Sequence, residues 1–210
     1  MSTIAVIDFE TTGISPAQGA RATEVAVVML EGGRIVDRFQ SLMNAGVPIP
    51  SFITQLTGIT REMVAAAPSA DAVMREAARF VGARPMVAHN AAFDRQFWRA
   101  ELVRCGLDGS HAFACTLLLS RRLYPQAPNH KLGTLAAWHR LPVSGRAHRA
   151  LADAEMAAHL LAQIQQDLQL AHGCRSADHA LLAGLQATAR PQVQAYLRRH
   201  GHMTTEMKHA

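Results

Sequence analysis

Cysteine is scarce in this chain, with three residues among 210. Cys105, Cys115 and Cys174 are odd in number and far apart, and no C-x-x-C pair exists. This spacing argues against a disulfide framework and against a thiolate zinc site. We therefore expect reduced thiols and a cytoplasmic protein.

Long hydrophobic runs are absent too. No segment approaches the roughly 18 consecutive apolar residues of a membrane span, and the apolar opening, Ile4-Ala5-Val6-Ile7, is far too short for the core of a signal peptide. The sequence therefore predicts no association with a membrane. What is present is 49% hydrophobic and 18% charged residues, which suits a folded core. The net charge of +5 permits a polyanionic partner without proving one.

The order of apolar runs predicts an α/β domain built on one mixed sheet. Strands are expected over 4–9, 24–30, 34–43 and 85–88, with a hairpin turn at Gly32-Gly33. Helices are expected over 69–83, 93–104, 116–123, 132–141, 150–170, 177–186 and 192–199. We place the main domain at residues 1–172 and a helical C-terminal extension with a polar tail at 173–210. The tail holds His200 and His202, which have no partner motif and are interpreted as solvated.

The first candidate site residues are in Asp8-Phe9-Glu10, at the end of the first expected strand. Residues two apart on a strand point to the same face, so both carboxylates project together. Two like charges beside a core repel each other and resist desolvation, and a bound divalent cation would remove that penalty. The structural alternative is a solvated strand end, where one acid is common and two on one face are less so.

A second group is His89-Asn90-Ala91-Ala92-Phe93-Asp94, between a short strand and a helix. Asp94 falls in the first helical turn, where the helix dipole alone favours a carboxylate. Asn90 could equally be only the helix cap. We interpret His89 as a structural, hydrogen-bonding histidine rather than a ligand.

The third group is the pair His148 and Asp153. On one continuous helix, residues five apart would point about 140° away from each other and could not share a site. The pair is consistent with a common site only if His148 lies on the loop after Gly145 and Asp153 lies within the helix. A histidine on such a loop is well placed to exchange protons near neutral pH. The structural alternative for Asp153 is an acid near a helix start, but its apolar flanks indicate that it faces inward.

Together these segments provide four carboxylates and one histidine from three distant parts of the chain. Hard oxygen ligands without thiolates or paired histidines suit Mg²⁺ or Mn²⁺ rather than zinc. Phosphodiester hydrolysis by two metal ions needs this set: acids that hold the ions and a base that activates water.

The order Asp-x-Glu-Thr-Thr-Gly, His-Asn-Ala-Ala-Phe-Asp and His-x-x-x-x-Asp resembles the DnaQ-like, DEDDh-type 3′→5′ exonucleases over roughly residues 4–170. Within that family the motifs look most like the proofreading epsilon subunit of bacterial replicative DNA polymerase and its stand-alone relatives. The sister DEDDy subclass has Tyr where this chain has Arg149. The resemblance implies an RNase H-like fold, with a mixed five-stranded sheet flanked by helices.

The resemblance also implies roles for individual residues. Asp8 would bridge two ions, with Glu10 and Asp153 completing one site and Asp94 supporting the other. His148 would be the general base. Glu10, with the backbone near Thr11 and Thr12, would hold the terminal 3′-hydroxyl. Further substrate contacts are expected from Asn90, from Phe93 and from the Leu56-Thr57-Gly58-Ile59 loop, including Thr57 and Ile59.

The implied activity is release of 5′-mononucleotides from a single-stranded or frayed 3′ end, with DNA favoured. A 3′→5′ exoribonuclease of the RNase T kind is the main alternative. A second is a polymerase-associated subunit that mainly binds its partner; Gln165–Leu170 faintly resembles a sliding-clamp peptide, although an ordinary amphipathic helix is the stronger interpretation. A third is a catalytically dead relative, which the five chemically competent site residues argue against.

Overall fold

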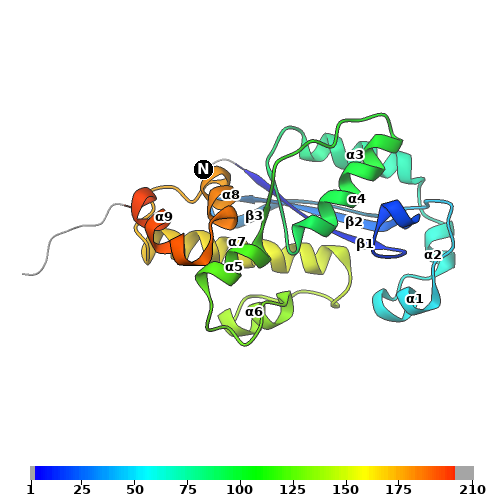
Figure 1. Ribbon diagram of the computed structural model, residues 1–210. Helices are drawn as coiled ribbons and strands as arrows, with labels where there is room; N and C mark the ends of the chain where they lie inside the picture. Colours follow the sequence, from blue (N-terminus) through cyan, green and yellow to red (C-terminus); the bar gives the residue numbers. More distant parts are fainter. Residues whose placement is uncertain (1–2, 202–210) are drawn as a thin grey trace, which may run out of the picture.

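The computed structural model describes residues 3–201 (Figure 1). Its strands are β1 (Ile4–Thr11), β2 (Ala22–Glu31), β3 (Arg34–Leu42), β4 (Met86–Ala88) and β5 (Phe113–Cys115). Its helices up to the middle of the chain are α1 (Ser51–Thr57), α2 (Arg61–Ala65), α3 (Ala70–Val81) and α4 (Ala91–Arg104). Those that follow are α5 (Thr116–Leu123), α6 (Leu132–His139), α7 (Ala150–Leu170), α8 (His179–Ala187) and α9 (Val193–His200). Two short 3-10 turns lie at Pro16–Gln18 and Arg190–Gln192.

The five strands form one mixed sheet in the order β3-β2-β1-β4-β5. The first three strands are antiparallel neighbours, whereas β4 and β5 run parallel to β1. The expected five-stranded mixed sheet is therefore confirmed.

Both faces of the sheet are covered, and the period-two alternation of β1 divides its side chains between two cores. Ile4 and Val6 pack in the cluster that contains α7, whereas Ala5, Ile7 and Phe9 pack in the cluster that contains α3 and α4. Figure 1 shows α7 along one side of the sheet and α3 and α4 on the other. Asp8 and Glu10 continue the Ile4 and Val6 series, so they point toward α7.

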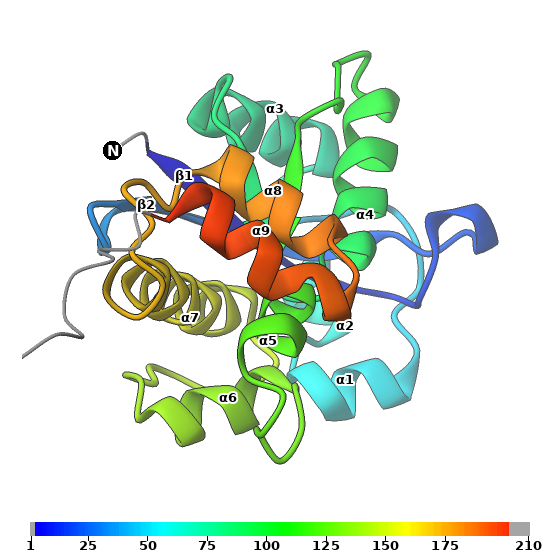
Figure 2. The ribbon, with the colours of Figure 1, turned by 60° about the vertical axis from the view of Figure 1, so that its left-hand side comes forward.

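The C-terminal extension packs against the main domain rather than standing apart. Helix α8 lies on β5 and α5 (Figure 2), and Leu182, Leu185 and Leu197 belong to the same hydrophobic cluster as α7. The Gln186 side chain pairs with the backbone of β5: its Oε1 accepts from Cys115 N at 2.6 Å and its Nε2 donates to Phe113 O at 3.1 Å. The amide thus takes the place of a neighbouring strand at this edge of the sheet. Of the pair His200 and His202, His202 lies outside the described residues.

Several local expectations need correction. The chain pattern indicated neither β5, which at three residues is too short to display a period, nor the short helices α1 and α2. The sliding-clamp interpretation of Gln165–Leu170 is wrong for this fold, because the segment is the last part of α7 and Leu168 is fully buried. Among residues 3–201, no helix is long and apolar enough to cross a membrane.

Candidate active site

The candidate site begins at the end of β1, where Asp8 and Glu10 project toward α7. Glu10 lies directly opposite Glu24 of β2, and Asp8 lies opposite Ala26. Asp153 belongs to the first turn of α7, the helix that covers this face of the sheet. One carboxylate oxygen from each of Asp8, Glu10 and Asp153 can be chosen so that all three lie within 4.8 Å of one another.

Asp94 joins this group from the other side of β1. It lies in the first turn of α4, directly after β4, and its side chain is 2% exposed. Strand β4 pairs with β1 only through Ala5 and Val6, which leaves the end of β1 free on that edge. The Oδ1 of Asp94 accepts a hydrogen bond from Phe9 N at 3.2 Å there. The fold therefore brings the fourth acid to the same strand end.

Burial and mutual repulsion perturb these acids strongly. Burial, followed by the charges of Asp94, Glu10 and Asp153, raises the pKa of Asp8 well above its ordinary value. Burial is also the main reason why the pKa of Glu10 and that of Asp94 are each raised to about 8. The pKa of Asp153 is raised by burial as well. The cluster therefore resists being fully ionised unless a cation enters it.

His148 lies at the rim of this cluster, on the segment that precedes α7. As the spacing of the pair required, the histidine is on a loop and Asp153 is in the helix. The two are joined by a hydrogen bond from His148 N to Asp153 Oδ2 at 3.1 Å. His148 has a left-handed backbone, with φ +60°, which turns the chain sharply into the helix. Its imidazole is exposed to the solvent.

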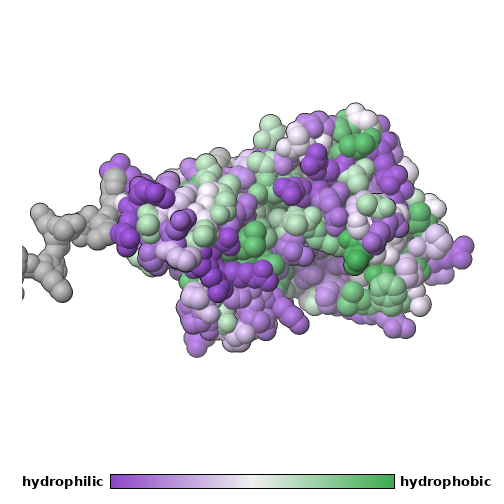
Figure 3. Space-filling model, viewed as in Figure 1, coloured by the Kyte–Doolittle hydropathy of each residue, from purple (hydrophilic) through white to green (hydrophobic). Residues whose placement is uncertain are grey.

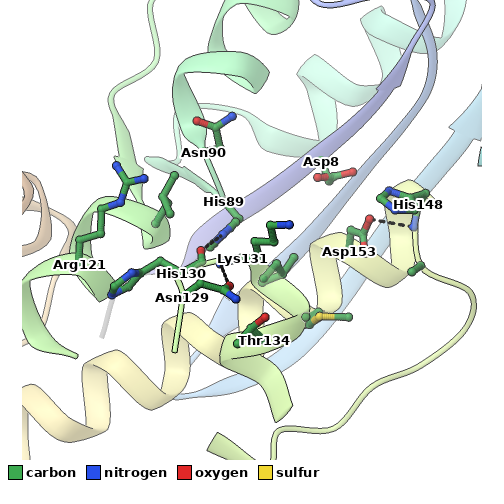
Figure 4. Close-up of a pocket in the computed structure, with 15 residues that line it drawn as sticks. Asp8, His89, Asn90, Arg121, Asn129, His130, Lys131, Thr134, His148 and Asp153 are labelled. Atoms are coloured by element: carbon green, nitrogen blue, oxygen red, sulfur yellow. Dashed lines mark hydrogen bonds between the residues drawn. The ribbon is translucent and has the colours of Figure 1, made fainter. Parts of the chain in front are cut away.

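A cleft of about 1090 Å³ extends from the acids toward α5 and α6. Asp8, His148 and Asp153 lie at one end (Figure 4), and Arg121, His130 and Lys131 line the remainder. Neither Arg121 nor Lys131 forms an ion pair with an acid in the described part of the chain. In the space-filling view the surface is hollowed where the α6 region faces α1 (Figure 3). The cleft therefore combines an anionic end with a cationic wall, which is formed by Arg121 and Lys131.

His89 fixes the cationic wall to the sheet, and its interpretation as a structural residue is confirmed. Burial lowers the pKa of His89 to about 4, so its ring is neutral at physiological pH. Its Nε2 lies 3.0 Å from His130 O and its Nδ1 lies 2.9 Å from Thr116 Oγ1. A neutral ring satisfies both contacts when Nε2–H donates to the carbonyl and Nδ1 accepts from the hydroxyl. Figure 4 shows the contact with His130.

The residues expected at the substrate are not equally accessible. Thr57 is 1% exposed, its hydroxyl bonded to Ile53 O and to Ile59 N, and the Ile59 side chain is fully buried. Neither side chain is free to contact a ligand in this structure. On the same segment, Phe52 and Leu56 are 61% and 48% exposed.

Thr11, Thr12 and the residues at the start of α4 also differ in how available their side chains are to a substrate. Thr11 is buried and donates to Gly13 O at 2.7 Å, whereas Thr12 Oγ1 accepts from Arg21 N at 3.0 Å. Asn90 lines the cleft and occupies the N-cap position of α4, as expected, although its side chain makes no capping hydrogen bond. Phe93 is half-buried and packs on Phe97, with ring centroids 5.0 Å apart.

Sequence reasoning missed the residues that surround the acids. Arg121 and Lys131 carried no signal that separates them from the other basic residues of the chain. Glu24 and Arg149, which form an ion pair beside Glu10, were also missed. An acid within the apolar run of β2 was the available sign for Glu24, because a charge at such a position needs a partner.

The donor set fits divalent cations. Carboxylate oxygens are the ligands that Mg²⁺ and Mn²⁺ prefer, and a cation would relieve the repulsion that raises the pKa values of these acids. The arrangement can therefore hold a divalent cation next to a histidine able to accept a proton.

The chain belongs to the Exonuclease family, whose model matches residues 5–161. The expected family membership is thus confirmed, and the chain is a nuclease domain. Among its sequence relatives is the DNA polymerase III PolC-type of Bacillus cereus, 36% identical over 167 residues. The match covers 79% of this chain but 12% of that protein. The PolC-type protein of Bacillus subtilis shows the same identity over 168 residues and the same coverage.

Solved structures agree with this assignment. Exonuclease X, determined in complex with 5′ overhanging duplex DNA, is 30% identical with a TM-score of 0.65. The match covers 78% of this chain and 91% of that one. The nuclease domain of 3′hExo, a DEDDh family member bound to rAMP, has a TM-score of 0.67 at 22% identity, covering 79% and 92% of the two chains. The expected RNase H-like fold is confirmed.

Proposed function

We propose that this domain is a DEDDh-type 3′→5′ exonuclease that hydrolyses the terminal phosphodiester bond of DNA and releases 5′-mononucleotides. The observation that carries the proposal is the gathering of Asp8, Glu10 and Asp153 within 4.8 Å, beside Asp94 and with His148 at the rim. No arginine forms an ion pair with these four acids in the part of the chain that the structure describes.

Two Mg²⁺ or Mn²⁺ ions are the proposed cofactors, held by Asp8, Glu10, Asp94 and Asp153. Such ions, when bound, stabilise the charge that develops on the phosphate and on the leaving oxygen. His148 accepts the proton of the attacking water. Its exposure to solvent lets the proton leave after each turnover, and its contact with Asp153 keeps it beside the acids.

The cationic wall supports a polyanionic substrate. Arg121 and Lys131 line the same cleft as Asp8 but have no acidic partner among the described residues. Cations placed in this way neutralise backbone phosphates, which bind largely through charge. The exposed Leu56 and Phe52 on α1 provide apolar surface for a base, in place of the buried Thr57 and Ile59. The backbone near Thr11 and Thr12 is the proposed position of the 3′-hydroxyl, with Asn90 and Phe93 beside it.

The preference for DNA and an association with a polymerase are supported by the relatives. Exonuclease X was solved with DNA, and the PolC-type relatives are DNA polymerases. The match covers only 12% of the length of the PolC-type relative. We therefore propose a DNA polymerase subunit as a separate partner of this domain. Co-purification with polymerase subunits tests it, and a domain that acts alone would contradict it.

A digestion panel tests the activity. The substrates are single-stranded DNA, matched and mismatched primer-templates, and RNA, each with a free or a phosphate-blocked 3′ end. We expect mononucleotides from free DNA 3′ ends in Mg²⁺ or Mn²⁺, none in EDTA, and none from the Asp8→Ala protein. Cutting of circular DNA would replace the proposal with an endonuclease, and faster digestion of RNA would favour the exoribonuclease alternative.

A further inference from the structure

Arg149 and Glu24 form an ion pair immediately beside the acid cluster, with the carboxylate fully buried and the guanidinium partly exposed. Arg149 Nε lies 3.0 Å from Glu24 Oε2 and Arg149 Nη2 lies 2.8 Å from Glu24 Oε1. The Glu24 side chain is fully buried and also accepts from Gln40 Nε2 at 2.6 Å and from Ala150 N at 3.1 Å. The carboxylate therefore accepts four hydrogen bonds, and three of them come from the consecutive residues Arg149 and Ala150, where the chain enters α7.

Two other hydrogen bonds hold the segment that enters α7, from His148 N to Asp153 Oδ2 and from Ser144 Oγ to Glu155 Oε2. Residues 142–148 are exposed to solvent. His148 has a positive φ, Arg149 is extended, and no side chain of the segment caps α7. Glu24 instead supplies the acceptor for the first helical N–H, from a neighbouring strand, where a negative charge also suits the positive end of the helix. The contacts of Arg149 and Ala150 with Glu24 thus fix the chain on the C-terminal side of His148, next to its own bond to Asp153.

The register of the sheet places the Arg149–Glu24 pair next to the acid cluster. Glu24 lies directly opposite Glu10, so the two side chains share one face of the sheet. Because Arg149 binds Glu24 through both Nε and Nη2, its own backbone is fixed relative to Glu10. Because His148 precedes Arg149 directly, the same contact places His148 relative to the cluster.

We infer that Arg149, through its two-point contact with Glu24, is a positioning residue that holds His148 over the acid cluster. The inference rests on the proposed role of His148 as the base. A planar guanidinium fixes orientation in a way that a single ammonium cannot.

The test is a double-mutant cycle on the whole chain, measuring kcat on single-stranded DNA at saturating Mg²⁺. Arg149→Met should lower kcat about 10- to 100-fold, as loss of an orienting partner does. In the His148→Ala background the same change should cause no further loss, because its effect passes through His148. Arg149→Lys, which keeps one contact, should fall between wild type and Arg149→Met. An equal loss in both backgrounds would overturn the inference.

Arg21 offers a matched control. It binds Glu101 with two contacts of 2.8 and 2.9 Å, and the next backbone N–H, that of Ala22, donates to the same carboxylate. This pair joins the start of β2 to α4 rather than to the His148 segment. Arg21→Met should destabilise the fold yet change kcat by the same factor with and without His148.

Two readouts separate positioning from misfolding. Calorimetric titration with Mn²⁺ should give the same dissociation constant for Arg149→Met and wild type, since the four acids remain in place. If Arg149→Met does not fold, Glu24→Gln, which keeps the shape of the side chain, replaces it in the cycle with the same expected pattern. If His148→Ala itself leaves kcat unchanged, the proposed function fails; if His148 matters but Arg149→Met is as active as wild type, only the positioning role fails.

Discussion

Buried carboxylates occur in two different settings around the same strand. Glu24 and Glu101 are each bound by an arginine in two-point contact and by a backbone N–H. Burial alone would raise the pKa of Glu24, but hydrogen bonds from Arg149, Gln40 and Ala150 lower it below its ordinary value. The four acids of the cluster form no ion pair with an arginine among the described residues, although Asp94 and Asp153 each accept from one backbone N–H, and the pKa of every one of the four is raised.

The presence or absence of an arginine partner distinguishes structural acids from functional acids more clearly than burial does. A buried acid with an arginine is satisfied by the fold, whereas a buried acid repelled by its neighbours is left for a ligand. Each prediction below tests one side of this comparison.

The largest effect is expected from removing an acid of the unpaired group. Asp8→Ala or Asp153→Ala should reduce exonuclease activity to background, because the metal-binding oxygens are lost. Radiolabelled or fluorescent 3′-end release assays measure the rate, and Mn²⁺ titration measures the binding. Normal turnover by either variant would show that the unpaired acids are not the metal site.

His148→Ala should slow hydrolysis by about 10²- to 10⁴-fold, which is typical for loss of a general base. Metal affinity should remain, since the four carboxylates are intact. The check is single-turnover kinetics at saturating metal. Weaker metal binding with no rate defect would instead make His148 a ligand.

Neutralising an acid should have opposite effects on stability in the two groups. Glu101→Gln breaks a buried ion pair and should lower the free energy of unfolding by about 3 kcal/mol. Glu10→Gln removes a repelled charge and should raise the stability of the metal-free protein. Chemical denaturation in EDTA measures both, and the comparison fails if the two variants change stability in the same direction.

The pH dependence of the metal-free protein follows from the same pKa values. The pKa of Glu10 and that of Asp94 are raised from 4.5 and 3.8 to about 8. The folded state therefore binds more protons than the unfolded state between about pH 4 and pH 8, so the contribution of these groups to stability falls as pH rises through that window. Thermal melts in EDTA should show this fall, and Asp94→Asn should flatten it. Added Mn²⁺ should stabilise more at pH 8 than at pH 6, and a constant increment would contradict the assignment.

The smallest effect is expected from the cationic wall. Lys131→Gln should weaken DNA binding modestly and reduce the slope of log affinity against log salt by about 0.7, as for one lost phosphate contact to a single strand. Arg104→Gln, which removes an exposed charge on α4 away from the cleft lining, is the control and should leave the slope unchanged. Fluorescence anisotropy at several salt concentrations measures both.

The long elements and the acids were predictable because each carried a local pattern. Strands β1 to β3 are long enough to show alternation, and the position of Asp8 and Glu10 two apart required a common face. The separation of His148 from Asp153 likewise required a loop followed by a helix. Three-residue β5 could not show a period, and α1 offered no long apolar stripe.

The partners of the acids could not be predicted from local pattern. That Glu24 lies opposite Glu10 depends on the register between two strands, and that Arg149 reaches Glu24 depends on α7 packing across them. Similarly, Thr57 and Ile59 looked available for a ligand, but tertiary packing buries both side chains. Contacts of high sequence separation decide which polar residues are satisfied and which are free.

The contacts of the Gln186 amide with β5 limit how far this nuclease can be truncated at its C-terminal end. The family match ends at residue 161, yet the outer edge of β5 is closed by the side chain of Gln186, well beyond it. A fragment trimmed to the matched residues would present bare strand hydrogen-bonding groups to solvent and to other copies, the usual route to edge-to-edge aggregation. The segment that matches the family model is thus shorter than the segment whose side chains complete the edge of the sheet.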